Sequence, residues 1–388
     1  MSTCSKLLHV HAFPTPPVKM EILIIVKCLF FLEGLLLSSF TPNILLNKCS
    51  TALIYGLGYI SSFAWVWYAD QSRAIAPILI TCLTLSMALK WTLRQLFVPD
   101  NLAAFFTLFS TSMIIPLTCA FTMMQCNPRQ ERESWSFQYS FLLLGRLART
   151  FIPEKQTGLL FDSIVSLIFA VFVVSIPWIQ ARNLAAKSID PKEEPPQQIH
   201  TPISELIGQA RYLYFLVSVL FASFFFCFTR KTILDEAKIS VSPLPSWILL
   251  SFEILTCWAA YFLCPHRIPP QRFFLLAQIL IASRFLLFYF APSWIEISDL
   301  ISSIGFVVFS VANAQIVATH GKPGLEYTTC ALVDIMRNGL GPVVFVLLRS
   351  YLGAMKVALI GCTIFTMGFV GKYFLVDYPH DKLIKKRE

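Results

Sequence analysis

The stretch "QARNLAAKSIDPKEEPPQQIHTPISELIGQAR", Gln180 to Arg211, is the longest polar segment of this 388-residue sequence and lies near its middle. Proline and charged residues are concentrated in it, a composition typical of a linker rather than of a packed element. The sequence on either side is strongly apolar. The stretch therefore predicts two apolar halves joined by a polar linker.

The rest of the chain has the composition of a membrane protein. Of all residues 56% are hydrophobic and 14% are charged, and the mean hydropathy is +0.66, which no ordinary soluble domain reaches. A helix needs roughly 20 mainly apolar residues to cross about 30 Å of hydrocarbon. Such windows occur at 21–41, 51–69, 75–96, 102–124, 136–152, 159–179, 210–229, 244–264, 273–291, 297–318, 327–349 and 354–376. The sequence thus predicts an all-α integral membrane fold with twelve transmembrane helices in two pseudo-symmetric six-helix halves.

The windows and the linker divide the chain into five parts. These are a cytoplasmic N-terminal tail (1–20), a first six-helix half (21–180), a cytoplasmic linker (181–209), a second six-helix half (210–377) and a basic cytoplasmic tail (378–388). Lysine and arginine collect on the side of the tails and the linker, which the positive-inside rule assigns to the cytoplasm. We expect a plasma membrane or bacterial inner membrane location. This asymmetry explains the net charge of +9 without a nucleic-acid partner.

Landmarks in the two halves recur at a nearly constant offset. Trp65, Lys90, Pro99, Glu131 and Pro153 correspond to Trp258, Arg284, Pro292, Glu326 and Pro342, at shifts of 193, 194, 193, 195 and 189 residues. This order favours duplication of one six-helix unit. The alternative is that unrelated membrane helices resemble one another through their composition.

With two six-helix halves, a central linker and cytoplasmic termini, the chain resembles the major facilitator superfamily of secondary transporters. The family's signature loop joins Gly-x-x-x-Asp to basic residues and a further glycine. In "VWYADQSRA" Asp70 fits, Arg73 is near its expected place and both glycines are missing. "LVDIMRNGLGPVVF" resembles the family's Gly/Pro-rich eleventh helix, and "ADQSRAIAP" and "NPRQERESW" bear a looser similarity to reduced-folate and thiamine carriers.

This resemblance implies transport by alternating access. In the family's architecture helices 1, 4, 7 and 10 line a central cavity, helices 2, 5, 8 and 11 flank it, and helices 3, 6, 9 and 12 stand outside. The loop with Asp70 and Arg73 corresponds to the family's gating loop, which stabilises one conformation through contacts with neighbouring helix ends.

Ionisable residues inside the predicted windows need an explanation, because a charge near the bilayer centre costs at least about 2.5–3.5 kcal/mol. Eight are considered: Glu33, Lys90, Arg146, Arg149, Glu253, Arg284, Asp334 and Arg337. Lys90 and Arg284 belong to the outer third and ninth windows, which favours a structural role or contact with lipid headgroups.

Arg146 and Arg149 lie near the middle of the fifth window. Their spacing of three predicts a shared helix face. Two guanidinium groups on one face can hold a carboxylate or a phosphate, so both are predicted substrate-binding residues. The alternative is that they join the halves through acids such as Glu131 or Glu253.

The eleventh window contains the corresponding pair, Asp334 and Arg337. The same spacing of three predicts that these two side chains pair with each other, and Arg337 is a further substrate-binding candidate. Glu253 is the predicted counter-ion of a buried arginine. Asn313, in the tenth window, is a predicted substrate contact because an amide both donates and accepts hydrogen bonds.

Glu33 lies near the middle of the first window, beside Gly34. Burial favours the neutral form of a carboxyl group unless a cation is close. Glu33 is therefore predicted to load and release a proton as the cavity alternates between the two sides. The alternative is a structural hydrogen bond made by a protonated acid.

Five basic residues against three acidic ones leave the windows with excess positive charge. This balance predicts a secondary transporter for a small anionic metabolite or vitamin, as a proton symporter or else an exchanger. A facilitator for a neutral or cationic solute and a non-transporting sensor on the same fold remain alternatives. We find no catalytic motif and no metal or cofactor site, so no enzyme is predicted. Since twelve spans can form a complete transporter, we expect a monomer in contact with lipid.

Overall fold

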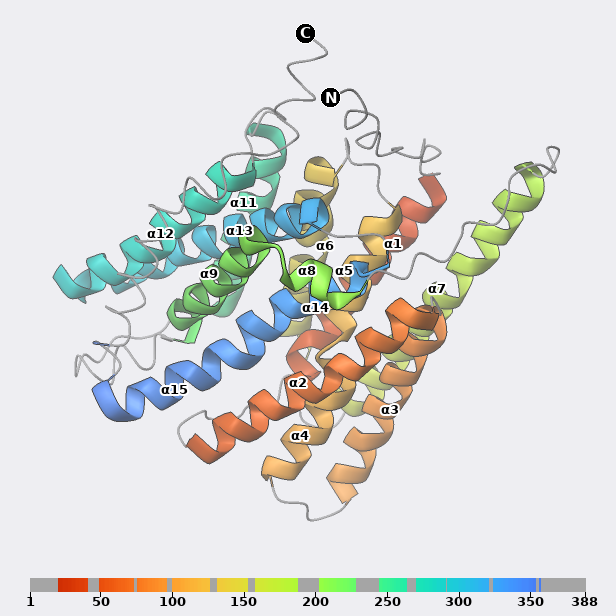
Figure 1. Ribbon diagram of the computed structural model, residues 1–388, viewed down its shortest axis with the longest axis horizontal. Coiled ribbons are helices and arrows are strands. Elements are labelled where there is room, and N and C mark those ends of the chain that lie inside the picture. The colour runs from red at the N-terminus through yellow and green to blue at the C-terminus, as the bar shows by residue number, and fades with distance from the viewer. Residues whose placement is uncertain are drawn as a thin grey trace, which may run out of the picture.

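The computed structural model describes residues 20–40, 49–72, 75–95, 100–125, 131–152, 158–187, 202–227, 244–263, 270–290, 292–320, 324–353 and 356, which are almost entirely helical (Figure 1). The first half contains α1 (Met20–Phe40), α2 (Cys49–Ser72), α3 (Ile75–Gln95), α4 (Asp100–Thr111), α5 (Ile114–Gln125), α6 (Glu131–Thr150) and α7 (Gly158–Lys187). The second half contains α8 (Ile203–Ile207), α9 (Ala210–Cys227), α11 (Ser246–Leu263), α12 (Pro270–Phe290), η1 (Pro292–Trp294), α13 (Ile295–His320), α14 (Glu326–Asp334), η2 (Ile335–Leu340) and α15 (Gly341–Leu352).

Eleven of the predicted windows coincide with these helices. The fourth window is divided between α4 and α5, and the eleventh between α14, η2 and α15. The twelfth window, 354–376, lies outside the described residues apart from residue 356. Among the described residues, five helical stretches are long and apolar enough to cross a membrane: Ile75–Leu93, Asn101–Phe121, Gly158–Ser175, Ile295–Ala314 and Glu326–Leu352. Length and composition thus support a multi-pass membrane protein.

The two halves repeat the same helix pairings. In the first half α1 packs on α6, and both α2 and α3 pack on α4. In the second half α9 packs on η2 and α15, and both α11 and α12 pack on α13. With the windows numbered one to six within each half, both halves pair the first window with the fifth, and the second and third with the fourth. This is expected if one six-helix unit was duplicated.

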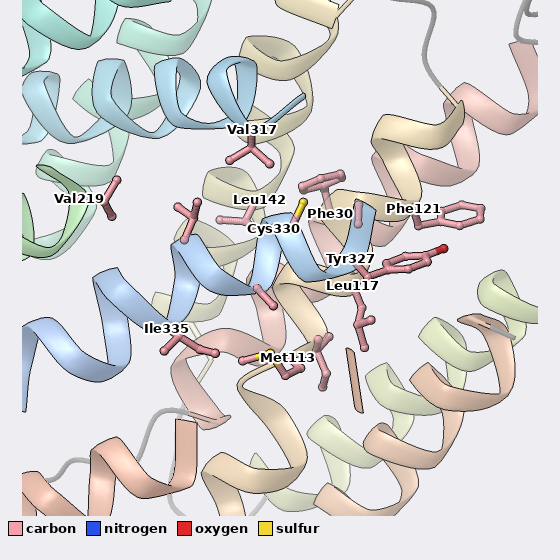
Figure 2. Packing of buried hydrophobic residues seen from close by; sticks show 14 of the residues in the cluster. Phe30, Met113, Leu117, Phe121, Leu142, Val219, Val317, Tyr327, Cys330 and Ile335 are labelled. Carbon is pink, nitrogen blue, oxygen red and sulfur yellow. The ribbon is translucent and has the colours of Figure 1, made fainter. Parts of the chain in front are cut away.

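The halves meet along two seams. On one side α2 packs against α14, η2 and α15, and α5 packs against α14; on the other, α6 packs against α11 and α13. Buried apolar residues continue from one half to the other. Figure 2 shows Met113, Leu117 and Phe121 of the first half close to Tyr327 and Cys330 of the second. The helices that carry the predicted site therefore border the interface between the halves.

The fourth window is broken at Ser112 because of Pro116. Proline has no N–H to donate to the carbonyl four residues earlier, and its ring crowds that carbonyl. The broken end is held by α2: the Trp65 indole N–H donates to the Phe109 carbonyl at 2.8 Å, and the Ser112 hydroxyl donates to the Ser62 hydroxyl at 2.6 Å. These bonds give the Phe109 carbonyl and the Ser112 hydroxyl hydrogen-bond partners, which lipid chains cannot provide.

Glycines bring α1 and α6 into close contact. A Cβ atom on Gly34 would collide with the Leu142 carbonyl, and one on Gly145 would collide with the Phe31 carbonyl. Small residues allow this approach of two membrane helices. Gly34 directly follows Glu33 on α1, and Gly145 directly precedes Arg146 on α6. The close contact at the two glycines therefore fixes the positions of Glu33 and Arg146 relative to each other.

Candidate functional site

Polar and charged side chains from both halves gather at the interface. We call this set the interface cluster; its members are Glu33 (α1), Tyr139 and Arg146 (α6), Glu253 (α11), Ser310 and Asn313 (α13), Asp334 (α14) and Arg337 (η2). It contains six of the nine predicted site residues. Tyr139 and Ser310 were not in the predicted set.

Glu33 is 2% exposed, and neither of its carboxylate oxygens has a hydrogen-bond partner among the described residues. Its strongest electrostatic neighbour is another acid, Asp334, from the other half of the chain. A buried carboxylate without a cation partner is costly. The free-energy cost is high when two neighbouring carboxyl groups in an apolar environment both lose their protons. This arrangement is suited to holding a proton.

Asp334 and Arg337 are electrostatic neighbours, but no close ion-pair contact joins them among the described residues. Asp334 accepts a hydrogen bond from the Asn338 amide at 2.6 Å. The Arg337 guanidinium lies over the rings of Phe306 and Phe309, with its Cζ 4.5 and 5.6 Å from their centroids. Arg337 lies in η2, a π-helical turn that holds more residues per turn than an α-helix. A spacing of three therefore no longer gives a shared face.

Arg337 also connects the halves through Ser310. Its guanidinium donates to the Ser310 hydroxyl at 3.4 Å, and Ser310 is hydrogen-bonded to Tyr139 of α6. Tyr139 precedes Arg146 by seven residues, two helical turns, so both lie on the same face of α6. That spacing was the available sequence signal for Tyr139.

Arg146 is half-buried and has no ion pair or hydrogen bond among the described residues. Its electrostatic neighbours are Tyr139 and Glu253. Glu253 is hydrogen-bonded to Ser303, and its Oε2 atom has no partner. Glu253 thus lies near Arg146 and Arg337 as the predicted counter-ion should, but it does not close an ion pair with either.

Asn313 is 5% exposed, and neither its amide nitrogen nor its amide oxygen has a partner among the described residues. Buried amides in folded proteins are almost always hydrogen-bonded. Asn313 lies about one helical turn from Ser310 on α13, and its amide keeps its hydrogen-bonding capacity unused. The substrate contact predicted for Asn313 stays a prediction.

Arg149 lies in a different environment from Arg146. Its Nη2 atom is 3.5 Å from the Asp162 carboxylate of α7, its guanidinium stacks on Phe161, and Lys90 of α3 lies 3.4 Å from the same carboxylate. The two arginines therefore have different neighbours, and the substrate-binding role predicted for Arg149 stays a prediction. The residues Lys90, Arg149 and Asp162, which we call the buried triad, connect α3, α6 and α7 within the first half.

Asp162 was missing from the predicted set, although it lies inside the 159–179 window. It balances one of the two positive charges of Lys90 and Arg149 and so reduces the predicted positive excess from two to one. In the interface cluster two arginines face three carboxyl groups. The sign of the charge there consequently depends on how many of those carboxyl groups hold a proton.

Asp70 is 9% exposed and binds the beginning of α14. Its carboxylate accepts hydrogen bonds from the backbone N–H groups of Tyr327 and Thr328, at 3.2 and 2.8 Å, and from the Thr328 hydroxyl. An anion at a helix N-terminus is stabilised by the exposed N–H groups and the helix dipole. This contact joins the two halves at one end of α2. The predicted gating partner Arg73 and the side chain of Arg284 lie outside the described residues.

Among the described residues, no group of three or more His, Cys, Asp or Glu side chains is arranged to hold a metal ion. The polar groups of the interface cluster are acids, guanidinium groups, hydroxyls and an amide. They can bind an organic solute and hold a proton.

No family model and no curated protein matches this sequence. Solved structures do match its fold. The human organic anion transporter MFSD10 (TETRAN) has a TM-score of 0.62 at 14% identity, with 92% of this chain and 99% of that chain covered. The major facilitator superfamily transporter FucP, in the outward conformation, has a TM-score of 0.61 at 11% identity, covering 90% and 97%. The nucleoside transporter NupG has a TM-score of 0.58 at 15% identity, covering 92% and 100%. The chain therefore has the fold of the major facilitator superfamily transporters.

Proposed function

We propose that this protein is a secondary active transporter that moves a small organic solute across a membrane by alternating access. The observation that carries the proposal is a set of buried polar groups without partners at the interface between the halves. Glu33 and Asn313 are buried, and their side-chain polar atoms have no hydrogen-bond partner among the described residues. Arg146, on a third helix, is half-buried and forms no ion pair among the described residues. A fold whose halves meet at such groups is suited to binding a solute between them.

The proposed solute carries a carboxylate or phosphate, and the proposed coupling ion is the proton. When Glu33 and Asp334 are both protonated, Arg146 and Arg337 outnumber the remaining carboxylate of Glu253, and an anion restores the balance. When the acids lose their protons, they compete with the solute for the same guanidinium groups. Proton binding and anion binding would therefore favour each other, which is the requirement for symport.

A second candidate is an exchanger or facilitator for a neutral or cationic solute. The observation in its favour is that three carboxyl groups face two arginines in the interface cluster. If all three remain ionised, the cluster attracts a cation rather than an anion. The protonation state of Glu33 and Asp334 therefore distinguishes the two candidates.

Asp70 is the proposed gating residue. Its hydrogen bonds to α14 hold the two halves together at the end of α2 that the charge asymmetry places in the cytoplasm. Breaking them would open that end. In this scheme both termini are cytoplasmic and one chain forms the complete transporter.

The test uses proteoliposomes containing the purified full-length protein and a labelled pool of organic anions, nucleosides, sugars and amino acids. We expect uptake of an anion, driven by a proton gradient, that Arg146→Ala abolishes and Arg146→Lys partly retains. Gradient-independent uptake of a neutral or cationic solute, unaffected by Arg146→Ala, would support the second candidate. Movement of no solute by the wild-type protein would contradict transport itself.

A further inference from the structure

An apolar groove of about 710 Å³ lies between α1, α6 and α7, away from the interface between the halves. Its walls include Cys28 and Leu32 of α1, Leu144 and Ala148 of α6, and Phe172 of α7. Side chains at its border, such as Ile24 and Phe151, are 54% and 70% exposed. In a membrane-spanning chain such exposed apolar surface faces lipid, so the groove opens toward the bilayer.

Lys27 is the charged residue in the lining of this groove. Its Nζ atom lies 6.0 Å from the centroid of the Phe141 ring, which also lines the groove. Lys27 is seven residues from the start of α1 at Met20, a distance of roughly 10 Å along a helix that rises 1.5 Å per residue. A lysine at that depth can extend its ammonium group to the headgroup layer while its stem stays in hydrocarbon.

The groove lies behind two members of the interface cluster. Phe31 and Leu32, which line it, directly precede Glu33, and Leu144 and Leu147 flank the Gly145–Arg146 pair. The helices α1 and α6 are in direct backbone contact through Gly34 and Gly145. A molecule filling the groove would thus press on the helix pair that holds Glu33 and Arg146.

We propose that this groove binds one acyl chain of an anionic phospholipid, whose headgroup phosphate pairs with Lys27. The apolar walls match a hydrocarbon chain, and the single lysine at the level of the headgroups supplies the complementary charge. The lipid comes from the leaflet around the N-terminal end of α1, which the positive-inside rule places on the cytoplasmic side, where anionic lipids attract basic residues. Its binding stabilises the α1–α6 pair.

The test is lipid retention, which does not depend on the proposed transport activity. Full-length protein is reconstituted in vesicles of phosphatidylglycerol and phosphatidylcholine in equal amounts, re-extracted in mild detergent and examined by native mass spectrometry. We expect the wild type to retain phosphatidylglycerol in preference to phosphatidylcholine. Lys27→Gln should lower the retained phosphatidylglycerol about fivefold, the effect of one basic residue near a lipid surface, and Lys27→Arg should preserve it.

A second variant tests the groove itself. Ala148→Trp places a large side chain in the groove and should displace the lipid, whereas Leu167→Trp, at a 67% exposed position of α7 outside the groove, should not. The proposal is overturned if the wild type retains both lipids equally, if Lys27→Gln keeps the preference, or if the two tryptophan variants behave alike. A Lys27→Gln protein that loses anionic lipid but transports normally would still support the site. One that loses transport but retains the lipid would count against it.

Discussion

At the scale of single residues, the neighbours of a charge decide its role more than its spacing does. Arg146 and Arg149 are three residues apart on α6, yet one faces Glu253 of the second half and the other binds Asp162 of the first. The first forms no ion pair among the described residues and is suited to a ligand. The second forms an ion pair with Asp162, although its Nη1 atom has no hydrogen-bond partner among the described residues, and is suited to holding helices together.

The buried triad should contribute strongly to stability. Its side chains are largely buried, with 13% of Lys90 and 6% of Asp162 exposed in their ion pair. Replacing Asp162 by Asn leaves two buried cations without a counter-ion, which is expected to lower the free energy of unfolding by about 3–5 kcal/mol. Thermal unfolding in detergent measures this. The control Glu296→Gln, at an exposed acid of α13, should change little; equal effects of both variants would show that the triad is not stabilising.

Arg146 should behave in the opposite way. Because it makes no ion pair among the described residues, Arg146→Ala should leave thermal stability within experimental error of the wild type. It should weaken binding of the transported solute about 10- to 100-fold, the loss expected for a charged hydrogen bond. The shift of the unfolding temperature with added solute reports both quantities. A destabilised Arg146→Ala protein with unchanged solute affinity would make Arg146 a structural residue.

At the scale of helices, close packing depends on particular glycines. Gly145→Ala puts a methyl group against the Phe31 carbonyl of α1, and backbone cannot move aside as a flexible side chain can. We expect this variant to separate α1 from α6 and to lower both stability and transport. Gly158→Ala is the matched control, since a Cβ there would lie 3.7 Å from the Arg149 guanidinium, an ordinary contact. Equal tolerance of both changes would contradict the rigid α1–α6 pair.

The contact between α2 and α14 should control which side of the protein is open. Asp70→Asn removes the negative charge at the start of α14 and replaces one acceptor oxygen with a donor, so the closed end should open more often. Cys330 is 7% exposed in α14, and Cys82, in α3 away from this contact, is 0% exposed. Maleimide labelling followed by mass spectrometry should show faster modification of Cys330, with Cys82 unchanged. Unaltered labelling of Cys330 would argue against a gating role for Asp70.

At the scale of the whole molecule, the sequence predicted the all-helical fold and the positions of eleven helices, because hydrocarbon thickness sets helix length directly. The three-segment eleventh window and the break near Pro116 were not predicted as such. The proline was visible, but the hydrogen bond from the Trp65 indole to the Phe109 carbonyl near the break is a tertiary contact. The predicted boundaries of tails, linker and halves remain predictions.

The site was predicted unevenly for a similar reason. Residue type and depth singled out Glu33, Arg146 and Asn313, since polar groups in apolar helices are few. The direction in which a side chain points depends on helix rotation, and periodicity in uniformly apolar helices carries little information about it. Helix rotation gives Arg146 and Arg149 different neighbours. The π-helical turn contains Arg337, whose guanidinium lies over the Phe306 ring. The functional roles of these residues remain to be tested.

The proposed coupling between the halves leads to a prediction for the whole molecule. Glu33→Gln keeps the size of the side chain but cannot exchange a proton. We expect this variant to bind the solute and to exchange it across the membrane, while losing accumulation driven by a pH gradient. Counterflow and gradient-driven uptake in the same proteoliposomes separate the two activities. If accumulation persists in Glu33→Gln, the proton is carried elsewhere or another ion drives transport.

The π-helical turn Ile335–Leu340 has a consequence for how the length of this chain can vary. A hydrogen bond that reaches one residue further than in an α-helix accommodates one additional residue within the turn. Deleting a single residue here would restore an ordinary helix while α14 and α15 keep the faces that they present to α2. The register of the membrane segment would survive, and the side chains within the turn, Arg337 and Asn338 among them, would change direction. Insertion or loss of one residue at this point is thus a way to change the direction of the side chains in this turn without refolding the helix around them.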